Sequence, residues 1–138
     1  MRRKPNAVDT VAGAFAAALD QDDYVTAAAL LARDCLYRSS KGPVNGPLAI
    51  LESYRASSSW ARSHIENVRY ESTFRASSAT SAVITFIDHL EHAGRVHRYS
   101  CEQEIFIDQE GRIRQIVHRD LDGERERLDR LLRDLRIR

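Results

Sequence analysis

A histidine and a carboxylate alternate along one strand-like run near the end of the chain. The run is "RIRQIVHRDLDGE", residues 112–124, in which one residue separates Ile116 from His118 and His118 from Asp120. Side chains alternate between the two faces of a strand, so these three side chains share a face. An imidazole beside a carboxylate can be held in one tautomer and can exchange protons near neutral pH. The run therefore predicts either an acid–base pair or a buried polar pair that only satisfies its own hydrogen bonds.

The helices that must position this pair follow from the hydrophobic periodicity. Apolar side chains recur at helical spacing over residues 7–20 and predict an amphipathic helix there: Val8, Val11, Phe15 and Leu19. We expect a second helix over about 22–33 and a loop at 39–46, "SSKGPVNG". A third helix is expected to begin at Pro47, because proline is favoured in the first turn of a helix.

Four strand-like runs come next, joined by hairpin-length connections that contain Gly or Ser. They cover residues 65–76, 81–92, 96–108 and 112–121. A closing helix is predicted over about 123–138, where the leucines form one stripe. Helices packed on an antiparallel sheet give an α+β fold, which we expect to be a single domain over residues 1–138 with a flexible start at about 1–6. Such a sheet curls around the first helix and leaves a blind cavity, where a ligand is expected.

Three stretches match the motifs of a known fold family. They are "FAAALDQDDYVTAAALLARDCLYRS", "GPLAILESYR" and "FIDQEGRIRQIVHRDLDGE". With them the chain resembles, over nearly its whole length, the nuclear transport factor 2-like superfamily, which includes ketosteroid isomerases, SnoaL-like polyketide cyclases, scytalone dehydratase and limonene-epoxide hydrolase. The resemblance implies a cystatin-like cone in which N-terminal helices pack against a strongly curved antiparallel sheet. It implies the fold rather than an activity, since this fold hosts many functions.

The catalytic positions of the ketosteroid isomerases are mostly replaced in this chain. In the alignment that the resemblance implies, the oxyanion-binding tyrosine falls at Phe15 and the general base at Ser39. The protonated aspartate falls at Gln103, and only the tyrosine of the third helix is kept, as Tyr54. Steroid isomerisation needs a base and a strong acid donor, so we do not expect that activity.

The epoxide hydrolase pattern is also broken. Limonene-epoxide hydrolase resembles the arrangement most, with cavity carboxylates on the same two strands. Its second aspartate falls at His118, and the arginine that accompanies its first aspartate falls near Phe86. This departure weakens the interpretation as an epoxide hydrolase.

The resemblance indicates which side of each strand faces the cavity, and those sides are mainly apolar, as a buried face should be. On them we assign Asp88, His118 and Asp120 as catalytic candidates. Burial among apolar side chains raises the pKa of a carboxyl group such as Asp88, which suits a proton donor. Asp120 has an alternative role, as the cap of a helix that starts near Gly123. The expected ligand-binding side chains are Phe15, Tyr54, Phe86, Leu90, Tyr99, Cys101, Gln103 and Ile116.

Composition narrows the choice of partners. The net charge is +1, so no global field attracts nucleic acid or an acidic membrane. No apolar stretch reaches the ~20 residues of a membrane span. "MRRK" before "VAGAFAAAL" mimics a secretory signal, but Asp9 interrupts it, so we expect a cytoplasmic protein. The histidines and the two cysteines, Cys35 and Cys101, have no metal-binding spacing, and we expect no metal or other cofactor.

Two functions of different classes fit these observations. The first is a cofactor-independent acid–base enzyme of the isomerase, dehydratase, cyclase or hydrolase class, acting on a small hydrophobic oxygenated molecule in the cone. The second is a non-catalytic domain of the same fold that binds a ligand or dimerises. The outer sheet face carries Thr85, Ile87 and Val117 among polar groups, which suits a sheet-mediated homodimer.

Overall fold

The computed structural model describes residues 7–137, and over this range the chain forms four helices and six strands. The expected flexible start at 1–6 lies outside the described residues. In chain order the elements are α1 (Ala7–Asp20), α2 (Tyr24–Ala29), β1 (Leu31–Arg38), β2 (Val44–Asn45), α3 (Pro47–His64), β3 (Asn67–Ala76), β4 (Ser81–His92), β5 (Arg95–Ile107), β6 (Ile113–Asp120) and α4 (Glu124–Asp134). None of these helices is long and apolar enough to cross a membrane.

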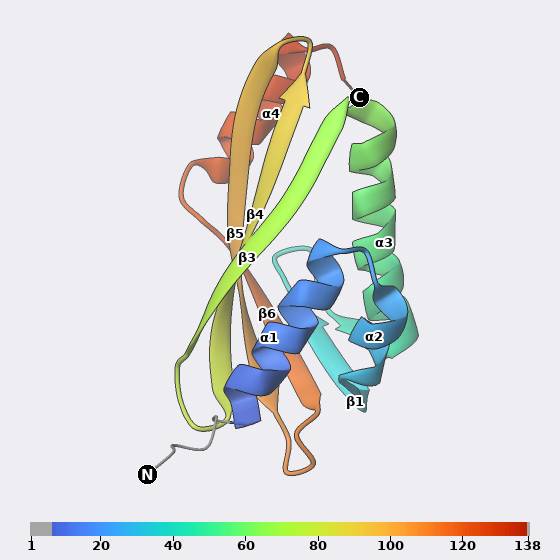
Figure 1. The fold of residues 1–138 in the computed structure, drawn as a ribbon, viewed down its shortest axis with the longest axis vertical. Coiled ribbons are helices and arrows are strands. Elements are labelled where there is room, and N and C mark those ends of the chain that lie inside the picture. The colour runs from blue at the N-terminus through green and yellow to red at the C-terminus, as the bar shows by residue number, and fades with distance from the viewer. Residues whose placement is uncertain (1–6, 138) are drawn as a thin grey trace.

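The strands form one mixed sheet in the order β2-β1-β6-β5-β4-β3. From β3 to β6 the sheet is an antiparallel meander, as predicted, whereas β1 runs parallel to β6. Figure 1 shows α1 lying across one face of the strongly twisted sheet, α3 along its side, and α4 behind β4 and β5. The predicted α+β fold, with helices packed on a curved sheet, is confirmed.

The predicted helix over residues 22–33 is wrong in its second half. α2 ends at Ala29, and the next residues form β1, Leu31–Arg38. "LARD" has good helix formers, so local propensity alone favours a longer helix. Long-range pairing decides the outcome, because β1 lies beside β6 with Tyr37 aligned with Ile116.

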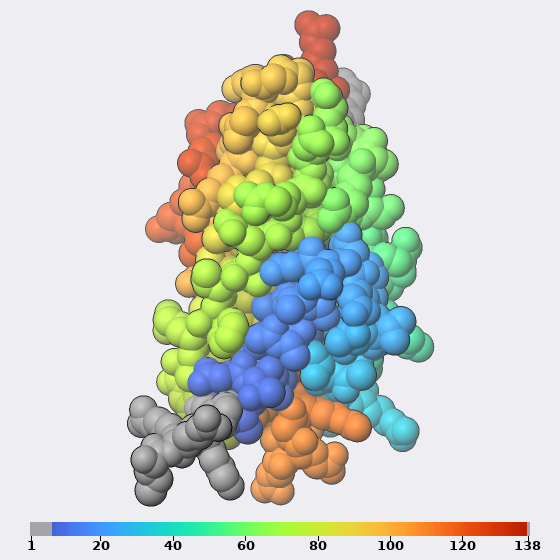
Figure 2. All heavy atoms as spheres, in the orientation of Figure 1, coloured from blue at the N-terminus to red at the C-terminus, as the bar shows by residue number. Residues whose placement is uncertain are grey.

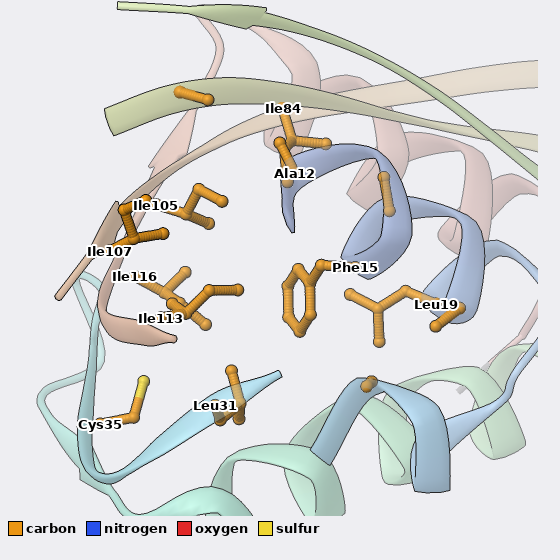
Figure 3. Packing of buried hydrophobic residues seen from close by; sticks show 14 of the residues in the cluster. Ala12, Phe15, Leu19, Leu31, Cys35, Ile84, Ile105, Ile107, Ile113 and Ile116 are labelled. Atoms are coloured by element: carbon orange, nitrogen blue, oxygen red, sulfur yellow. The ribbon is translucent and has the colours of Figure 1, made fainter. Parts of the chain in front are cut away.

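The core lies between α1 and the sheet. The buried stripe of α1 consists of Val8, Ala12, Phe15, Ala16, Ala18 and Leu19. Phe15 has no exposed surface, and Figure 3 shows its ring facing the isoleucines of the sheet, among them Ile113 and Ile116. Figure 2 shows the atoms of α1 and β3 in contact along this side of the molecule. Burial of this stripe fixes the rotation of α1 and therefore decides which of its polar residues face the sheet.

α4 covers the part of β5 that β6 does not reach. β6 ends at Asp120, so in the described sheet the start of β5 has no strand on that side. The Ser100 N–H donates to the Glu124 carboxylate at 3.0 Å, and the Arg98 carbonyl accepts from Arg127 at 3.1 Å. Two side chains of α4 thus satisfy backbone groups that an uncovered edge strand would expose.

Candidate active site

The three catalytic candidates lie on one face of the sheet, the face that α1 and α3 cover. Asp88 on β4 is paired with Tyr99 on β5, and His118 on β6 is paired with Gln103 on β5. Tyr99 and Gln103 are separated by an even number of positions along β5, so their side chains share a face. Asp120 follows His118 by two residues and lies on that face as well.

One side chain of α3 and three side chains of this sheet face form one hydrogen-bonded chain. The Tyr54 hydroxyl on α3 donates to Oε1 of Gln103. Nε2 of Gln103 lies 3.2 Å from Nδ1 of His118, and Nε2 of His118 lies 2.9 Å from Oδ1 of Asp120. The side chain of His118 is 16% exposed and that of Asp120 is 36% exposed, whereas Gln103 is buried. The chain therefore leads from the core to solvent.

Donor and acceptor roles along this chain fix the tautomer of His118. Gln103 accepts from Tyr54 through its oxygen, so its amide N–H group faces His118 and donates to Nδ1. Nδ1 must then carry a lone pair, and the proton of the neutral ring is on Nε2, from which it is donated to Asp120. Both ring nitrogens of His118 thus make hydrogen bonds, one to Gln103 and one to Asp120. His118 therefore holds Asp120 in place, and the Asp120 carboxylate is the last hydrogen-bond acceptor of the chain, on its solvent side.

We expect ¹⁵N NMR of the neutral imidazole ring to show His118 as the Nε2–H tautomer. His64 supplies an internal control, because its Nδ1 lies 2.8 Å from the Trp60 carbonyl oxygen, which only accepts. His64 should therefore be the Nδ1–H tautomer in the same spectrum. An Nδ1–H tautomer at His118 would contradict the hydrogen-bonded chain from Tyr54 to Asp120.

Asp120 is held in its ionised form. The hydrogen bond from His118 lowers the pKa of Asp120 below its usual value of 3.8, against the smaller opposing effect of burial. The charge of Arg125 and the Tyr99 hydroxyl, 3.5 Å from Oδ1, act in the same direction as His118. The alternative that Asp120 caps α4 is wrong, because Gly123 is the N-cap residue and no side chain makes a cap hydrogen bond there.

The surroundings of Asp88 raise its pKa, in contrast to those of Asp120. Its side chain has no hydrogen-bond partner within residues 7–137. Burial raises the pKa of Asp88 from 3.8 to about 6; the negative charge of Asp20 adds to the rise, and His89 opposes it. β4 and β6 are not neighbours, and the structure joins Asp120 to His118 but does not join Asp88 to it. One face therefore carries a carboxyl group that holds its proton to near neutral pH and a carboxylate that does not.

Asp20 is a further residue of this region and is not among the site residues predicted from the sequence. It ends α1, and its Oδ2 accepts a hydrogen bond of 2.6 Å from the Ser72 hydroxyl on β3. Its Oδ1 is buried and has no partner among the described residues. Burial raises the pKa of Asp20, more than the Ser72 hydrogen bond lowers it. The signal was present, since Val8, Ala12, Ala16 and Asp20 are spaced by four and lie on one side of a helix.

Tyr70 lies beside Asp88 across the β3–β4 pair but is bonded elsewhere. Its hydroxyl donates to Ser58 at 3.0 Å, and Ser58 donates to Asp22 at 2.8 Å. The Arg62 guanidinium lies over the Tyr70 ring at 4.8 Å and bonds Asp22 at 2.8 Å. These contacts tie α3 to β3 and to the turn after α1, and they direct the Tyr70 hydroxyl to Ser58 rather than to Asp88.

The predicted ligand-binding residues divide into two groups. Phe15 and Ile116 have no exposed surface and belong to the core. Tyr54 packs edge-on against both Phe15 and Tyr37, with ring centroids 6.1 and 5.9 Å apart, so three aromatic rings pack against one another there. The remaining residues lie on the sheet face around the two carboxyl groups, where each is buried or half-buried: Phe86, Leu90, Tyr99, Cys101 and Gln103.

Two hollows on the described surface lie away from this face. One of about 490 Å³ lies between the start of β5 and α4, and one of about 470 Å³ lies beside the start of β1 and the β5–β6 turn. His97 lines the first of them, but neither is lined by Asp88, His118 or Asp120. The candidate site is therefore defined by the polar side chains that share one sheet face, and not by either of these hollows.

No protein-family model matches the sequence, and no curated protein matches it significantly. Solved structures do match. An LEH-like epoxide hydrolase of Mycobacterium tuberculosis is 19% identical, with a TM-score of 0.65 and 94% of each chain covered. The Δ5-3-ketosteroid isomerase of a Mycobacterium species is 16% identical, with a TM-score of 0.61, 87% of this chain and 97% of that chain covered.

A third match is Rv0760c of Mycobacterium tuberculosis, solved in complex with estradiol-17β-hemisuccinate. It is 13% identical to this chain, with a TM-score of 0.65, 87% of this chain and 98% of that chain covered. The chain therefore has the cone-shaped fold of the nuclear transport factor 2-like superfamily, as the sequence motifs predicted. At these identities the likeness establishes the fold, and the activity has to be argued from the side chains.

Proposed function

We propose that this protein is a cofactor-independent acid–base enzyme that acts on a small hydrophobic oxygenated molecule. Asp88 is the proton donor, Asp120 is the proton acceptor, and His118 positions Asp120. The observation that carries the proposal is the contrast between two carboxyl groups on one sheet face. Asp88 is half-buried and has no hydrogen-bond donor among residues 7–137, whereas Asp120 accepts hydrogen bonds from His118 and Tyr99. Paired groups whose surroundings push their pKa values apart are typical of acid–base sites.

The proposed reaction needs two proton transfers, one from the ligand or a water molecule to the enzyme and one from the enzyme to the ligand. Asp120 takes a proton from a carbon or from a water molecule beside the ligand, and Asp88 gives its proton to the ligand oxygen on which negative charge develops. The same two transfers serve an isomerisation, a dehydration, a cyclisation or a hydrolysis. The residues at the isomerase positions, Phe15, Ser39 and Gln103, favour a reaction other than that of the ketosteroid isomerases.

The class of ligand follows from the side chains around the two carboxyl groups. Phe86 and Leu90 flank Asp88 along β4 on the same face and offer apolar contact. Burial raises the pKa of Cys101 to about 12, so its thiol contacts a ligand as a neutral group. The steroid ester bound by Rv0760c, a chain of similar fold, supports a hydrophobic molecule with oxygen substituents.

The pH dependence of turnover tests the proposal. The active form has Asp88 protonated and Asp120 ionised, so kcat/KM should fall about tenfold per pH unit above about 6, as Asp88 loses its proton. On the acid side it should fall only below the lowered pKa of Asp120. A panel of hydrophobic ketones, alcohols and epoxides, followed from pH 4 to 9, supplies the measurement. Turnover that does not change between pH 5 and 8 would exclude Asp88 as the acid.

The alternative function is a non-catalytic ligand-binding domain. The packing of Tyr54 between Phe15 and Tyr37 favours it, because aromatic rings fill space that a deep substrate would use. The same panel separates the two functions. Members that change the fluorescence of Trp60 on binding but are never converted would favour the binding domain over the enzyme.

We also propose that the protein is a homodimer that pairs through the outer sheet face. Support comes from the apolar Val117 among polar side chains, although Ile87 is only 7% exposed and adds little area. Light scattering at micromolar concentration should give twice the 15.7 kDa of the chain. A value of one chain mass would contradict the dimer.

A further inference from the structure

Two carboxyl groups from distant parts of the chain lie on the side of β3 and β4 that the end of α1 contacts. Asp20 is the last residue of α1, and Asp88 lies in the middle of β4. The sheet register places Ser72, which bonds Asp20, opposite Phe86, two residues before Asp88. The two carboxyl groups are near enough for the charge of Asp20 to act on Asp88. Like charges in partly buried surroundings cannot both form without a large cost, so such a pair tends to keep one proton.

The hydrogen bonds around the pair are unequal. Oδ2 of Asp20 accepts from the Ser72 hydroxyl at 2.6 Å, and a donor of this kind favours the ionised carboxylate. Asp88 has no donor among the described residues, because the hydroxyl of neighbouring Tyr70 is bonded to Ser58. Oδ1 of Asp20 is buried without a partner, as an acceptor that awaits a proton donor.

Within the part of the chain that the structure describes, the other titratable groups around the pair come from β3, β4, β5 and α3. β5 contributes Tyr99 and Cys101, which burial keeps neutral at physiological pH. β4 contributes His89, which is bonded to Glu71 on β3 at 2.6 Å. β3 also contributes Tyr70 and Glu71, and the negative charge of Glu71 raises the pKa of Asp20. α3 contributes Arg62, which is engaged by Asp22. None of them donates a hydrogen bond to either carboxyl group of the pair.

The geometry points to a charge-coupled carboxyl pair in which the Ser72 hydrogen bond favours the charge on Asp20 and the proton rests on Asp88. Asp20 is then a positioning residue for the acid of the proposed enzyme, and the inference rests on the proposed function for its catalytic meaning. The protonation of Asp88 then depends on two other elements. The rotation of α1 brings Asp20 to the sheet, and β3 supplies the hydrogen-bond donor, Ser72, that favours the charge on Asp20 rather than on Asp88.

The test is a site-resolved NMR titration of side-chain carboxyl carbons in the full chain. Asp20→Asn keeps the shape and removes the charge, so the Asp88 midpoint should fall by ~0.5 pH unit or more, as expected for loss of a partly screened like charge. Asp9→Asn removes the same charge from the other end of α1 and should leave Asp88 unchanged. Ser72→Ala removes the donor and should raise the Asp20 midpoint.

An Asp88 midpoint that stays the same in Asp20→Asn overturns the pair, and so does an Asp20 midpoint that does not rise in Ser72→Ala. The two variants fail independently, so a folding defect in one leaves the other informative. The titration does not use turnover, which separates the inference from the proposed function. If the Asp88 and Asp20 midpoints shift as expected but no compound of the panel is converted, the pair stands and the proposed enzyme is refuted. If compounds are converted but the midpoints do not shift, the enzyme stands and the pair is refuted.

Discussion

Replacing Phe15 with alanine is expected to lower the free energy of unfolding by about 3–5 kcal/mol, the usual range for a fully buried phenylalanine. Phe15 has no exposed surface and packs against the Tyr54 ring and the isoleucines of the sheet, so its removal leaves a cavity that several elements line. Urea unfolding of both proteins measures the difference.

Phe74→Ala is the matched control for this loss. Phe74 is 44% exposed on β3, so its truncation should cost no more than about 1–2 kcal/mol. If Phe15→Ala costs no more than Phe74→Ala, α1 does not pack on the sheet as described, and the position assigned to Asp20 fails with it.

Replacing Asp88 with asparagine is expected to reduce kcat/KM by about 10²–10⁴-fold, the contribution of a general acid. The amide keeps the size of the side chain but has no acidic proton to give to the ligand oxygen. Asp129→Asn, an exposed change on α4, removes the same charge and should leave turnover unchanged. Equal turnover in Asp88→Asn and wild type would leave the structure without a proton donor on this face.

The same variant should be more stable than wild type above pH 6. The pKa of Asp88 is raised in the folded state from 3.8 to about 6, so the folded protein holds this proton more tightly than the unfolded chain does. Ionising Asp88 therefore costs stability, and the cost grows between about pH 4 and 6 and is constant above. After allowance for its partial exposure, Asp88→Asn should gain about 1–2 kcal/mol at pH 8 and nothing at pH 4. A variant that is more stable and less active is the pattern expected of a functional carboxyl group.

The sequence predicted the elements whose pattern is long and regular. β3 to β6 each carry ten or so residues of alternating or apolar character between turn residues, and α1 has a clear stripe, so their bounds came close. β1 was missed because "LARDCLYR" has no alternation and contains helix formers. Its strand conformation depends on β6, which lies about 80 residues later in the chain, and single-segment patterns contain no information on such pairing.

The site was predictable where it depends on strand alternation alone. The spacing of His118 and Asp120 is enough to place them together, and the structure joins them at 2.9 Å. The partner of Nδ1 was not predictable, because Gln103 and Tyr54 reach His118 only through the register of β5 and the position of α3. Asp20 was missed for a similar reason: it follows the buried stripe of a helix, but its neighbour Ser72 is on a strand 52 positions away.

One measurement on the wild-type protein tests the acid–base assignment most directly: the titration of the Asp88 and Asp120 carboxyl carbons by NMR. The structure predicts that Asp88 titrates near pH 6 and that Asp120 titrates below 3.8, so that between these values one carboxyl group is protonated and the other ionised. If both titrate together near 3.8, the face holds two ordinary carboxylates and no proton donor. The acid–base enzyme would then be refuted, whatever the chain binds.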